Sequence, residues 1–198
     1  MRHFRWLVLL LVAGCTAVES DDKGSYEADL LDSQDGLQTS ADSPGRLSLV
    51  APNAWRRADL MHDPFPSHQP ETIVCDPLGT HEADGAFEVD TSYCNYALLT
   101  QELATDLPAG ATLEVLLSHG PLVWTEPAEG HIALALDGIV VWERTISIPS
   151  DAWIYQDSVL LKQGAAAGST WALHCHNHGA NSWRLYDVTW IQEEDASL

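Results

Sequence analysis

The chain has few basic residues. Nine Lys and Arg stand against 29 Asp and Glu, which gives a formal net charge of −20 at pH 7. Proteins that bind nucleic-acid backbones do so with clustered Lys and Arg, so the composition predicts no nucleic-acid partner. The same negative field repels anionic lipid headgroups. Attachment to a membrane would therefore need a lipid anchor rather than a basic surface.

Long apolar runs are also scarce, and the most prominent one, Trp6–Val12, follows Arg2 and Arg5. A helix needs roughly 20 apolar residues to cross a bilayer, and this run is far shorter. A basic start, a short apolar core and small residues after it are typical of a signal peptide. Residues 1–14 are therefore predicted to be an export signal.

The next feature is the run Leu-Val-Ala-Gly-Cys at residues 11–15, which resembles the lipobox of bacterial lipoproteins. The resemblance implies cleavage before Cys15, acylation of this cysteine and a stable membrane anchor made of its acyl chains. Thr16 follows the cysteine where Asp would retain the protein, which implies export to the outer membrane of the cell envelope. An ordinary secretory signal with a chance cysteine is the alternative.

Residues 15–45 are poor in aromatic side chains. Between residues 16 and 45 there are eight acidic residues against the single Lys23. Such segments bury too little apolar surface to fold, and their like charges keep them extended. We predict a disordered acidic linker that connects the lipidated Cys15 to a single folded domain.

Short apolar segments separated by Pro, Gly and Asp follow from residue 46 onward, and they indicate an all-β domain over residues 46–198. Asp137-Gly138 lies between two such segments and predicts a tight hairpin turn. We expect an antiparallel β-sandwich of the jelly-roll type. Its strands are predicted at residues 93–103, 112–119, 131–136, 139–146, 153–161, 170–178 and 182–191.

The cysteines beyond Cys15 are expected in an oxidising compartment, where disulfides persist. Cys75 and Cys94 bracket a turn-rich stretch and are the likelier disulfide pair. Strand alternation places Cys175 on the same apolar face as Trp171 and Leu173. Cys175 is therefore predicted to be a buried free thiol.

The histidines near Cys175 form the most chemically suggestive pattern. His174, His176 and His178 project from the opposite face of that strand, and His119 and His131 lie on strands nearby in the sequence. Imidazoles are common ligands of Zn and Cu. The five histidines are candidate metal ligands, and the alternative is that they are half-buried structural residues.

A second candidate site follows directly after, where Asn181, Trp183 and Arg184 come together around a turn. Indoles stack on sugar rings, while amide and guanidinium groups bind hydroxyls. These residues, with Trp124, are candidate ligands for a saccharide. Packing in the core is the alternative for either Trp.

The segments Leu136-Asp-Gly-Ile-Val-Val-Trp142 and Asn181-Ser-Trp-Arg-Leu185 resemble galactose-binding-like carbohydrate-binding modules with a jelly-roll fold. The resemblance covers about the last 110 residues, a size typical of sandwich domains. It implies ligand binding at loops or on a sheet face. Residues 94–96, 127–131 and 176–183 also resemble an uncharacterised group of predicted exported bacterial proteins, which implies no activity.

The sequence contains no Gly-x-Ser-x-Gly motif, and His81-Glu82 lacks the second histidine of a His-Glu-x-x-His site. We therefore expect a binding protein rather than an enzyme, and the sequence predicts no particular oligomeric state. Three hypotheses remain: a binding protein for a saccharide or envelope polymer, a metal-binding lipoprotein, and a structural envelope protein. An exposed aromatic beside Arg184 would favour the first, and convergence of His119, His131, His176 and His178 would favour the second.

Overall fold

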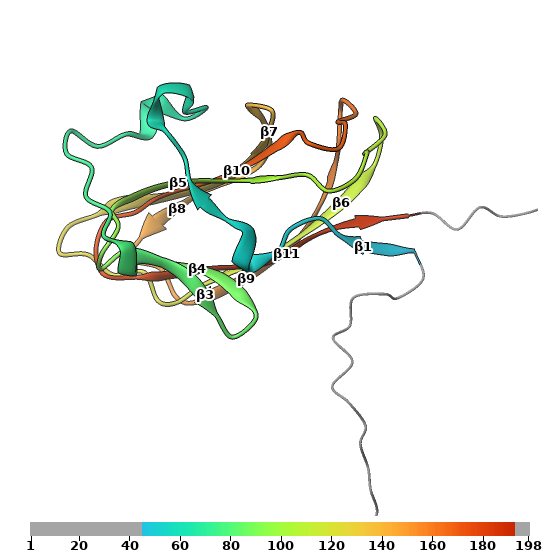
Figure 1. Ribbon diagram of the computed structural model, residues 1–198. Coiled ribbons are helices and arrows are strands. Elements are labelled where there is room, and N and C mark those ends of the chain that lie inside the picture. Colours follow the sequence, from blue (N-terminus) through green and yellow to red (C-terminus); the bar gives the residue numbers. More distant parts are fainter. Residues whose placement is uncertain (1–44, 193–198) are drawn as a thin grey trace, which may run out of the picture. The chain divides into compact units, whose positions relative to one another are not determined.

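The computed structural model describes residues 45–192, so the predicted signal peptide, Cys15 and almost all of the predicted linker lie outside the described residues. Within residues 45–192, no helix is long and apolar enough to cross a membrane. The predicted all-β fold is confirmed. Two sheets, in which every described strand pair is antiparallel, form a sandwich (Figure 1).

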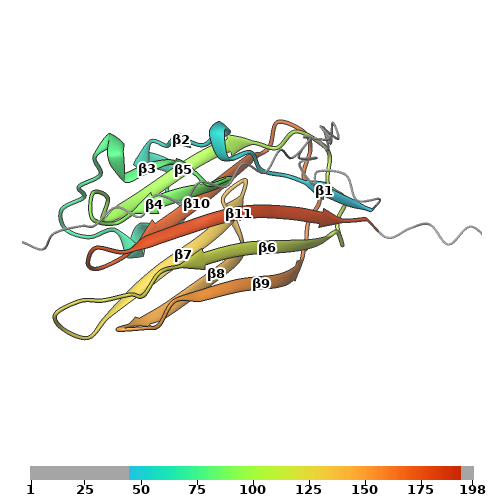
Figure 2. The same ribbon diagram turned by 90° about the horizontal axis from the view of Figure 1, so that it is seen from below.

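Sheet A has the strand order β3-β4-β11-β6-β9, and β1 pairs with the C-terminal part of β11. Figure 2 shows β11 and β6 side by side, with β9 at the edge. The main-chain amide of Gln192 donates to the Gly45 carbonyl at 2.7 Å, so the two ends of the described chain lie together. The strands of this sheet are β1 (Arg46–Ser48), β3 (Thr80–Ala83), β4 (Ala86–Asp90), β6 (Thr112–His119), β9 (Trp153–Leu160) and β11 (Ser182–Ile191).

Sheet B has the order β2-β5-β10-β7-β8. Its strands are β2 (Arg56–Arg57), β5 (Tyr96–Glu102), β7 (Ala128–Leu136), β8 (Ile139–Ile148) and β10 (Thr170–His176). Four short 3₁₀ turns complete the described elements: η1 (Pro52–Ala54), η2 (Leu60–His62), η3 (Pro66–His68) and η4 (Pro77–Gly79).

The two hairpins with Asp-Gly turns show how local sequence sets the strand pairing. Asp137 and Gly138 both have positive φ angles, 49° and 77°, which is the conformation that a two-residue turn between β7 and β8 requires. Asp84 and Gly85 repeat this turn with φ angles of 51° and 76° between β3 and β4. That stretch was expected to contain only turns, and the first four strands, β1 to β4, were not predicted.

The core lies between the sheets and follows the alternation of each strand. Trp171, Leu173 and Cys175 of β10 face this core, as predicted, and the thiol of Cys175 is free and buried. From the opposite sheet, Trp183 and Leu185 of β11 pack against them in the same cluster. Full burial of each such side chain stabilises the fold by about 1.5–3 kcal/mol.

Over β5, β10 and β7 the outer face of sheet B is not open to solvent, because the segment Ala58–Ile73 lies across it. Figure 1 shows this segment, in teal, on the side of β5 and β10 away from sheet A. Its Phe65 packs with Tyr96 and Leu98 of β5 in a second apolar cluster. We call this segment the cover.

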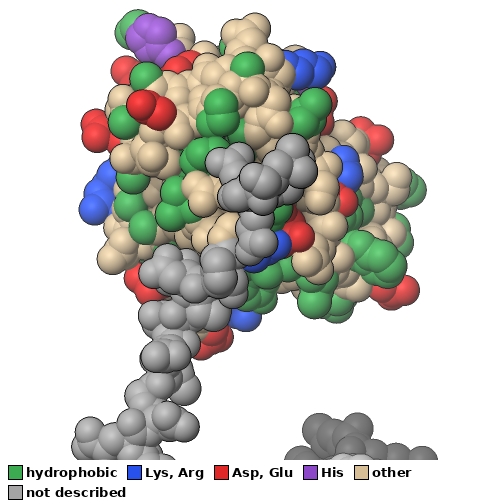
Figure 3. Space-filling view, turned by 90° about the vertical axis from the view of Figure 1, so that its right-hand side faces the viewer, with side chains coloured by type: hydrophobic (Ala, Val, Ile, Leu, Met, Phe, Trp, Pro, Cys, Tyr) green, Lys and Arg blue, Asp and Glu red, His purple; other side chains and the backbone are tan. Residues whose placement is uncertain are grey.

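The predicted disulfide between Cys75 and Cys94 is present, and it lies just after the cover and just before β5. The Arg57 guanidinium donates to the main-chain carbonyls of Cys75 and Asp76 beside it. The bridge therefore ties the C-terminal end of the cover to the sheet that the cover lies on. On the face shown in Figure 3, basic side chains (blue) are single and separated among acidic ones (red).

Candidate functional site

Trp183, predicted to stack on a sugar, lies in the core instead. Only 1% of its surface is exposed, because it and Leu185 are on the inward face of β11. Its indole fits against Gly130, where an added Cβ would lie 3.0 Å from the Trp183 ring. The prediction that Trp183 contacts a ligand is therefore wrong, and the alternative of core packing holds.

Asn181 is also buried, and its amide already has partners. Its side-chain oxygen accepts from the Val123 amide at 3.0 Å, and its side-chain nitrogen donates to the His178 carbonyl at 2.9 Å. These bonds join the loop between β6 and β7 to the turn between β10 and β11. Asn181 therefore holds two loops together, and the prediction that it binds a ligand is wrong.

Arg184 lies on the outer face of sheet A, whereas His174 lies on the outer face of sheet B. The reason is that the turn after β10 crosses from one sheet to the other before β11 begins. The two candidate sites predicted from these neighbouring segments therefore face opposite sides of the sandwich.

On sheet A, Arg184 is held in place by a buried carboxylate. Its Nε donates to Glu88 at 2.7 Å, and the Ser182 hydroxyl donates to the other oxygen of the same carboxylate, also at 2.7 Å. Glu88 is 7% exposed, and the pairing raises the pKa of Arg184. The guanidinium is therefore fixed while part of it stays open to solvent.

An open hollow lies beside Arg184, and we call it the Trp153 hollow. Trp153 is 62% exposed and Ile154 is 66% exposed, at the start of edge strand β9. The hollow is lined by Ser118, His119, Gly120, Ala152, Trp153, Ile154, Ser182 and Arg184. Trp153 lies on the same face of sheet A as His119, its partner on β6, whereas Arg184 lies on the face of Ser118 and Ile154, so the hollow takes in side chains from both faces at this end of the sheet. An exposed aromatic near Arg184 was expected to favour a saccharide, and the exposed aromatic that lines this hollow with Arg184 is Trp153.

Trp124, the remaining predicted ligand residue, is 50% exposed in the loop between β6 and β7. Its ring centroid lies 6.3 Å from that of His178. Trp124 does not line the Trp153 hollow. Its role in ligand binding stays a prediction.

His119 is apart from the other predicted metal ligands, inside the sandwich. Its Nδ1 donates to the Gly120 carbonyl at 2.7 Å, and its Nε2 lies 3.4 Å from the Tyr155 hydroxyl. Both ring nitrogens therefore have protein partners. Including His119 in one set with His131, His176 and His178 was wrong, because β6 belongs to sheet A and β7 and β10 belong to sheet B.

Two of the predicted histidines do meet, together with one that was not predicted. His131 of β7 and His174 of β10 lie under the cover, and His68 of the cover reaches them. One ring nitrogen from each residue lies within 4.8 Å of those of the other two. His68 was not predicted as a ligand because it lies in a Pro-rich turn, outside any strand pattern.

Burial is the main property of this cluster. His174 is fully buried and His131 is 3% exposed, and the Phe65 ring stacks on His174 with 4.6 Å between centroids. Desolvation lowers the pKa of His174 to about 2 and lowers that of His131. Both rings are therefore neutral at pH 7, and each has a lone pair to offer.

His176 and His178 flank this cluster. The ring centroids of the two are 5.2 Å apart, and desolvation lowers the pKa of His176 to about 4. His176 pairs directly across from His131 between β10 and β7, whereas His178 lies beyond the end of β10 and is exposed. The predicted strand ended two residues too late, so alternation does not extend to His178.

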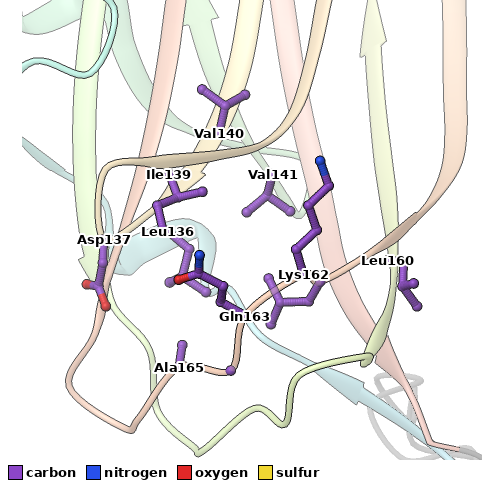
Figure 4. A pocket seen from close by; sticks show the side chains of 11 residues that line it. Leu136, Asp137, Ile139, Val140, Val141, Leu160, Lys162, Gln163 and Ala165 are labelled. Carbon is purple, nitrogen blue, oxygen red and sulfur yellow. The ribbon is translucent and has the colours of Figure 1, made fainter.

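Another cavity lies at the opposite end of sheet B, between the β7–β8 turn and residues 160–165 (Figure 4). Its volume is about 220 Å³, and Leu136, Ile139 and Val141 are among its mostly aliphatic lining residues. The Asp137 carboxylate points away from it in Figure 4 and accepts a hydrogen bond from the Thr170 amide at 2.8 Å. Ligand pockets are usually larger, roughly 300–1,000 Å³, with several convergent polar groups, so we assign no function to this cavity.

Comparison with protein-family models found no match, and comparison with curated proteins found none either. Solved structures with a similar fold include TmCBM27, a carbohydrate-binding module that recognises mannan, with a TM-score of 0.48 and 7% identity over 75% of this chain and 96% of that one. A family 11 carbohydrate-binding module from Clostridium thermocellum has a TM-score of 0.41 and 11% identity over 76% and 98%.

A third similar structure is the arabinose-bound α-L-arabinofuranosidase MgGH51, with a TM-score of 0.40 and 9% identity. The match covers 69% of this chain but only 23% of the enzyme. At these identities and scores the likeness concerns the sandwich alone. It assigns neither a ligand nor a reaction.

Proposed function

We propose that this chain is a lipid-anchored binding protein of the bacterial cell envelope, and that its sandwich binds a saccharide or envelope polymer at the Trp153 hollow rather than catalysing a reaction. The observation that carries this proposal is the exposed indole of Trp153 in one hollow with the fixed guanidinium of Arg184. An aromatic platform beside fixed hydrogen-bond donors is what a sugar ring needs.

The hollow contains polar groups that can form hydrogen bonds with the hydroxyls of a sugar. The Arg184 side chain is 36% exposed. Glu88 accepts from its Nε and Asp84 lies 3.8 Å from its Nη1, and the part of the guanidinium that stays exposed can donate to hydroxyls. The hydroxyls of Ser118 and Ser182 lie at the same hollow. The net charge of −20 disfavours polyanionic polymers, so we propose a neutral or cationic saccharide.

The lipid anchor is a separate part of the proposal and rests on the lipobox-like residues 11–15. Acyl chains on Cys15 would hold the protein to the membrane, and Thr16 would direct it to the outer membrane. The acidic linker would carry the sandwich away from the bilayer. The anchor would supply the membrane attachment that a basic surface gives other proteins, because this chain has few basic residues.

A saccharide panel titrated into the full-length protein in detergent tests the binding site. Trp153→Ala should weaken binding at least about fivefold, since loss of stacking removes about 1 kcal/mol. Met61→Ala is the control, because it truncates an exposed apolar side chain of the cover, outside the hollow, and it should bind as the parent does. Equal affinity of Trp153→Ala and parent, or no binding of any saccharide, would overturn the proposal.

Substitution of Cys15 tests the anchor. Cys15→Ala should leave an unprocessed precursor and abolish labelling by radioactive palmitate, measured after membrane fractionation of the expressing bacterium. A mature N-terminus at any residue other than Cys15 contradicts lipidation. That result would leave the saccharide proposal intact.

A further inference from the structure

The cluster of His68, His131 and His174 has no role in the saccharide proposal, because it lies on the other sheet from the Trp153 hollow. We propose that these three side chains bind one transition-metal ion that prefers imidazole nitrogen, Zn²⁺ or Cu²⁺. The convergence of three ring nitrogens within 4.8 Å is the first observation that supports this site. Three histidine ligands with an open fourth position are a common arrangement for zinc.

The second observation is independent of the first: the buried nitrogens lack partners. Both ring nitrogens of His174 and the Nδ1 of His131 are buried without a hydrogen bond. A buried polar atom without a partner destabilises a fold, and native structures contain few of them. A metal ion bound by one nitrogen of each ring would give two of these three atoms, the Nδ1 of His131 and one nitrogen of His174, the partner that the surrounding protein does not supply.

Glu143 of β8 provides a third observation, because it fixes the tautomer of His131. The Nε2 of His131 lies 3.3 Å from the Glu143 carboxylate. An ionised carboxylate only accepts hydrogen bonds, so Nε2 must carry the proton and Nδ1 must carry the lone pair. Nδ1 is the atom that lies buried without a partner. A carboxylate bound to the far nitrogen of a ligating histidine is a recurrent feature of metal sites.

The position of His68 adds a structural consequence. Its ring is stacked on that of His131, with 3.7 Å between centroids and 7° between planes, so their lone pairs lie alongside one another. Imidazoles bind a metal in the ring plane, so the His68 ring must turn for both residues to bind one ion. His68 is only partly buried, in the three-residue 3₁₀ element η3 of the cover, and this leaves room for its ring to rotate. The metal would then join the cover to sheet B.

The experiment uses the full-length protein in detergent, freed of metal with a chelator and then titrated with Zn²⁺ and with Cu²⁺. We expect one ion per chain, measured by calorimetry and by elemental analysis after desalting. For Cu²⁺, pulsed electron paramagnetic resonance should detect the coordinated imidazoles directly. His68→Gln should weaken binding by at least about tenfold, the smallest effect usual for loss of even a supporting residue, and should remove one imidazole from the copper spectrum.

The matched control is His62→Gln, the same change at an exposed histidine of the neighbouring turn η2, which should bind as the parent does. Glu143→Gln should weaken binding by about tenfold or more through the tautomer of His131. Both residues are partly or largely exposed, so these variants should keep the fold even if substitution of buried His174 does not. Retention of full affinity by His68→Gln, or a stoichiometry far below one, would overturn the site. Saccharide binding should survive the chelator, so this proposal and the saccharide proposal can fail separately.

Discussion

The outer faces of the two sheets differ in whether their buried polar groups have hydrogen-bond partners. On sheet A, the buried carboxylate of Glu88 is bound by Arg184 and Ser182, and the surface around it is open. On sheet B, the cover buries His174 completely and leaves both of its ring nitrogens without a partner. A buried polar group with protein partners needs nothing more. One without them points to a missing ligand or to a cost in stability.

The largest effect that separates the two faces should come from Phe65, which packs the cover onto sheet B. Phe65 is 4% exposed, and Phe65→Ala should lower the free energy of unfolding by about 3–5 kcal/mol, because a large buried side chain leaves a cavity. Denaturant unfolding measures this. Met61→Ala, in the same segment at a side chain that is 79% exposed, should change stability by about 0.5 kcal/mol or less. Equal effects of the two changes would show that the cover does not pack on the sheet.

An intermediate effect should appear in the pH dependence of the metal-free protein. The pKa of His174 is about 2 in the folded state and about 6.5 when unfolded. Below pH 6.5 the unfolded chain binds a proton that the folded chain does not, so stability falls as the pH falls, until the folded pKa is reached. At pH 5 this single residue should lower stability by about 2 kcal/mol.

His174→Phe provides the comparison, since Phe keeps an aromatic ring beside Phe65 and Tyr96 but does not titrate. The free energy of unfolding of this variant should fall less steeply between pH 6.5 and 4. The difference in slope should correspond to about one proton fewer taken up on unfolding. Saturating metal should flatten the slope of the parent as well. Parallel pH profiles of parent and variant in the metal-free state would show that His174 is protonated in the folded protein.

The smallest effect on stability should come from the Trp153 hollow, at the end of sheet A. Trp153→Ala removes a side chain that is 62% exposed and should change the free energy of unfolding by about 0.5 kcal/mol or less, while it weakens saccharide binding. Thermal unfolding and a saccharide titration on the same sample measure both. A large loss of stability would assign Trp153 to packing rather than to ligand binding.

Local patterns predicted the strands well wherever one face of the strand is buried. Alternation located β6 and β9 within a residue and placed Cys175 in the core. The same rule could have placed Trp183 in the core beside Leu185, but the register shift between Leu185 and Asp187 interrupts the alternation of β11. The hairpin of β3 and β4 was missed although Asp84-Gly85 repeats the signal that located β7 and β8.

The candidate sites depended more on distant contacts. Alternation correctly placed His174 on the face away from the core, but nothing in that pattern shows that Phe65 covers it or that His68 reaches it. The same holds for Trp153 and Arg184, which are 31 positions apart in the sequence and lie in one hollow because β9 and β11 both flank β6.

The sequence by itself determined the features that depend on neighbouring residues: the negative charge, the lipobox-like run, the alternation of the strands and the Asp137-Gly138 turn. Only the tertiary structure decided which sheet each strand joined, and therefore which side chains share a surface. The physical reason is that a strand pattern specifies two faces but not what packs on them. The turn after β10 sends His174 and Arg184 to opposite sides of the sandwich, and the cover brings His68 onto one of them.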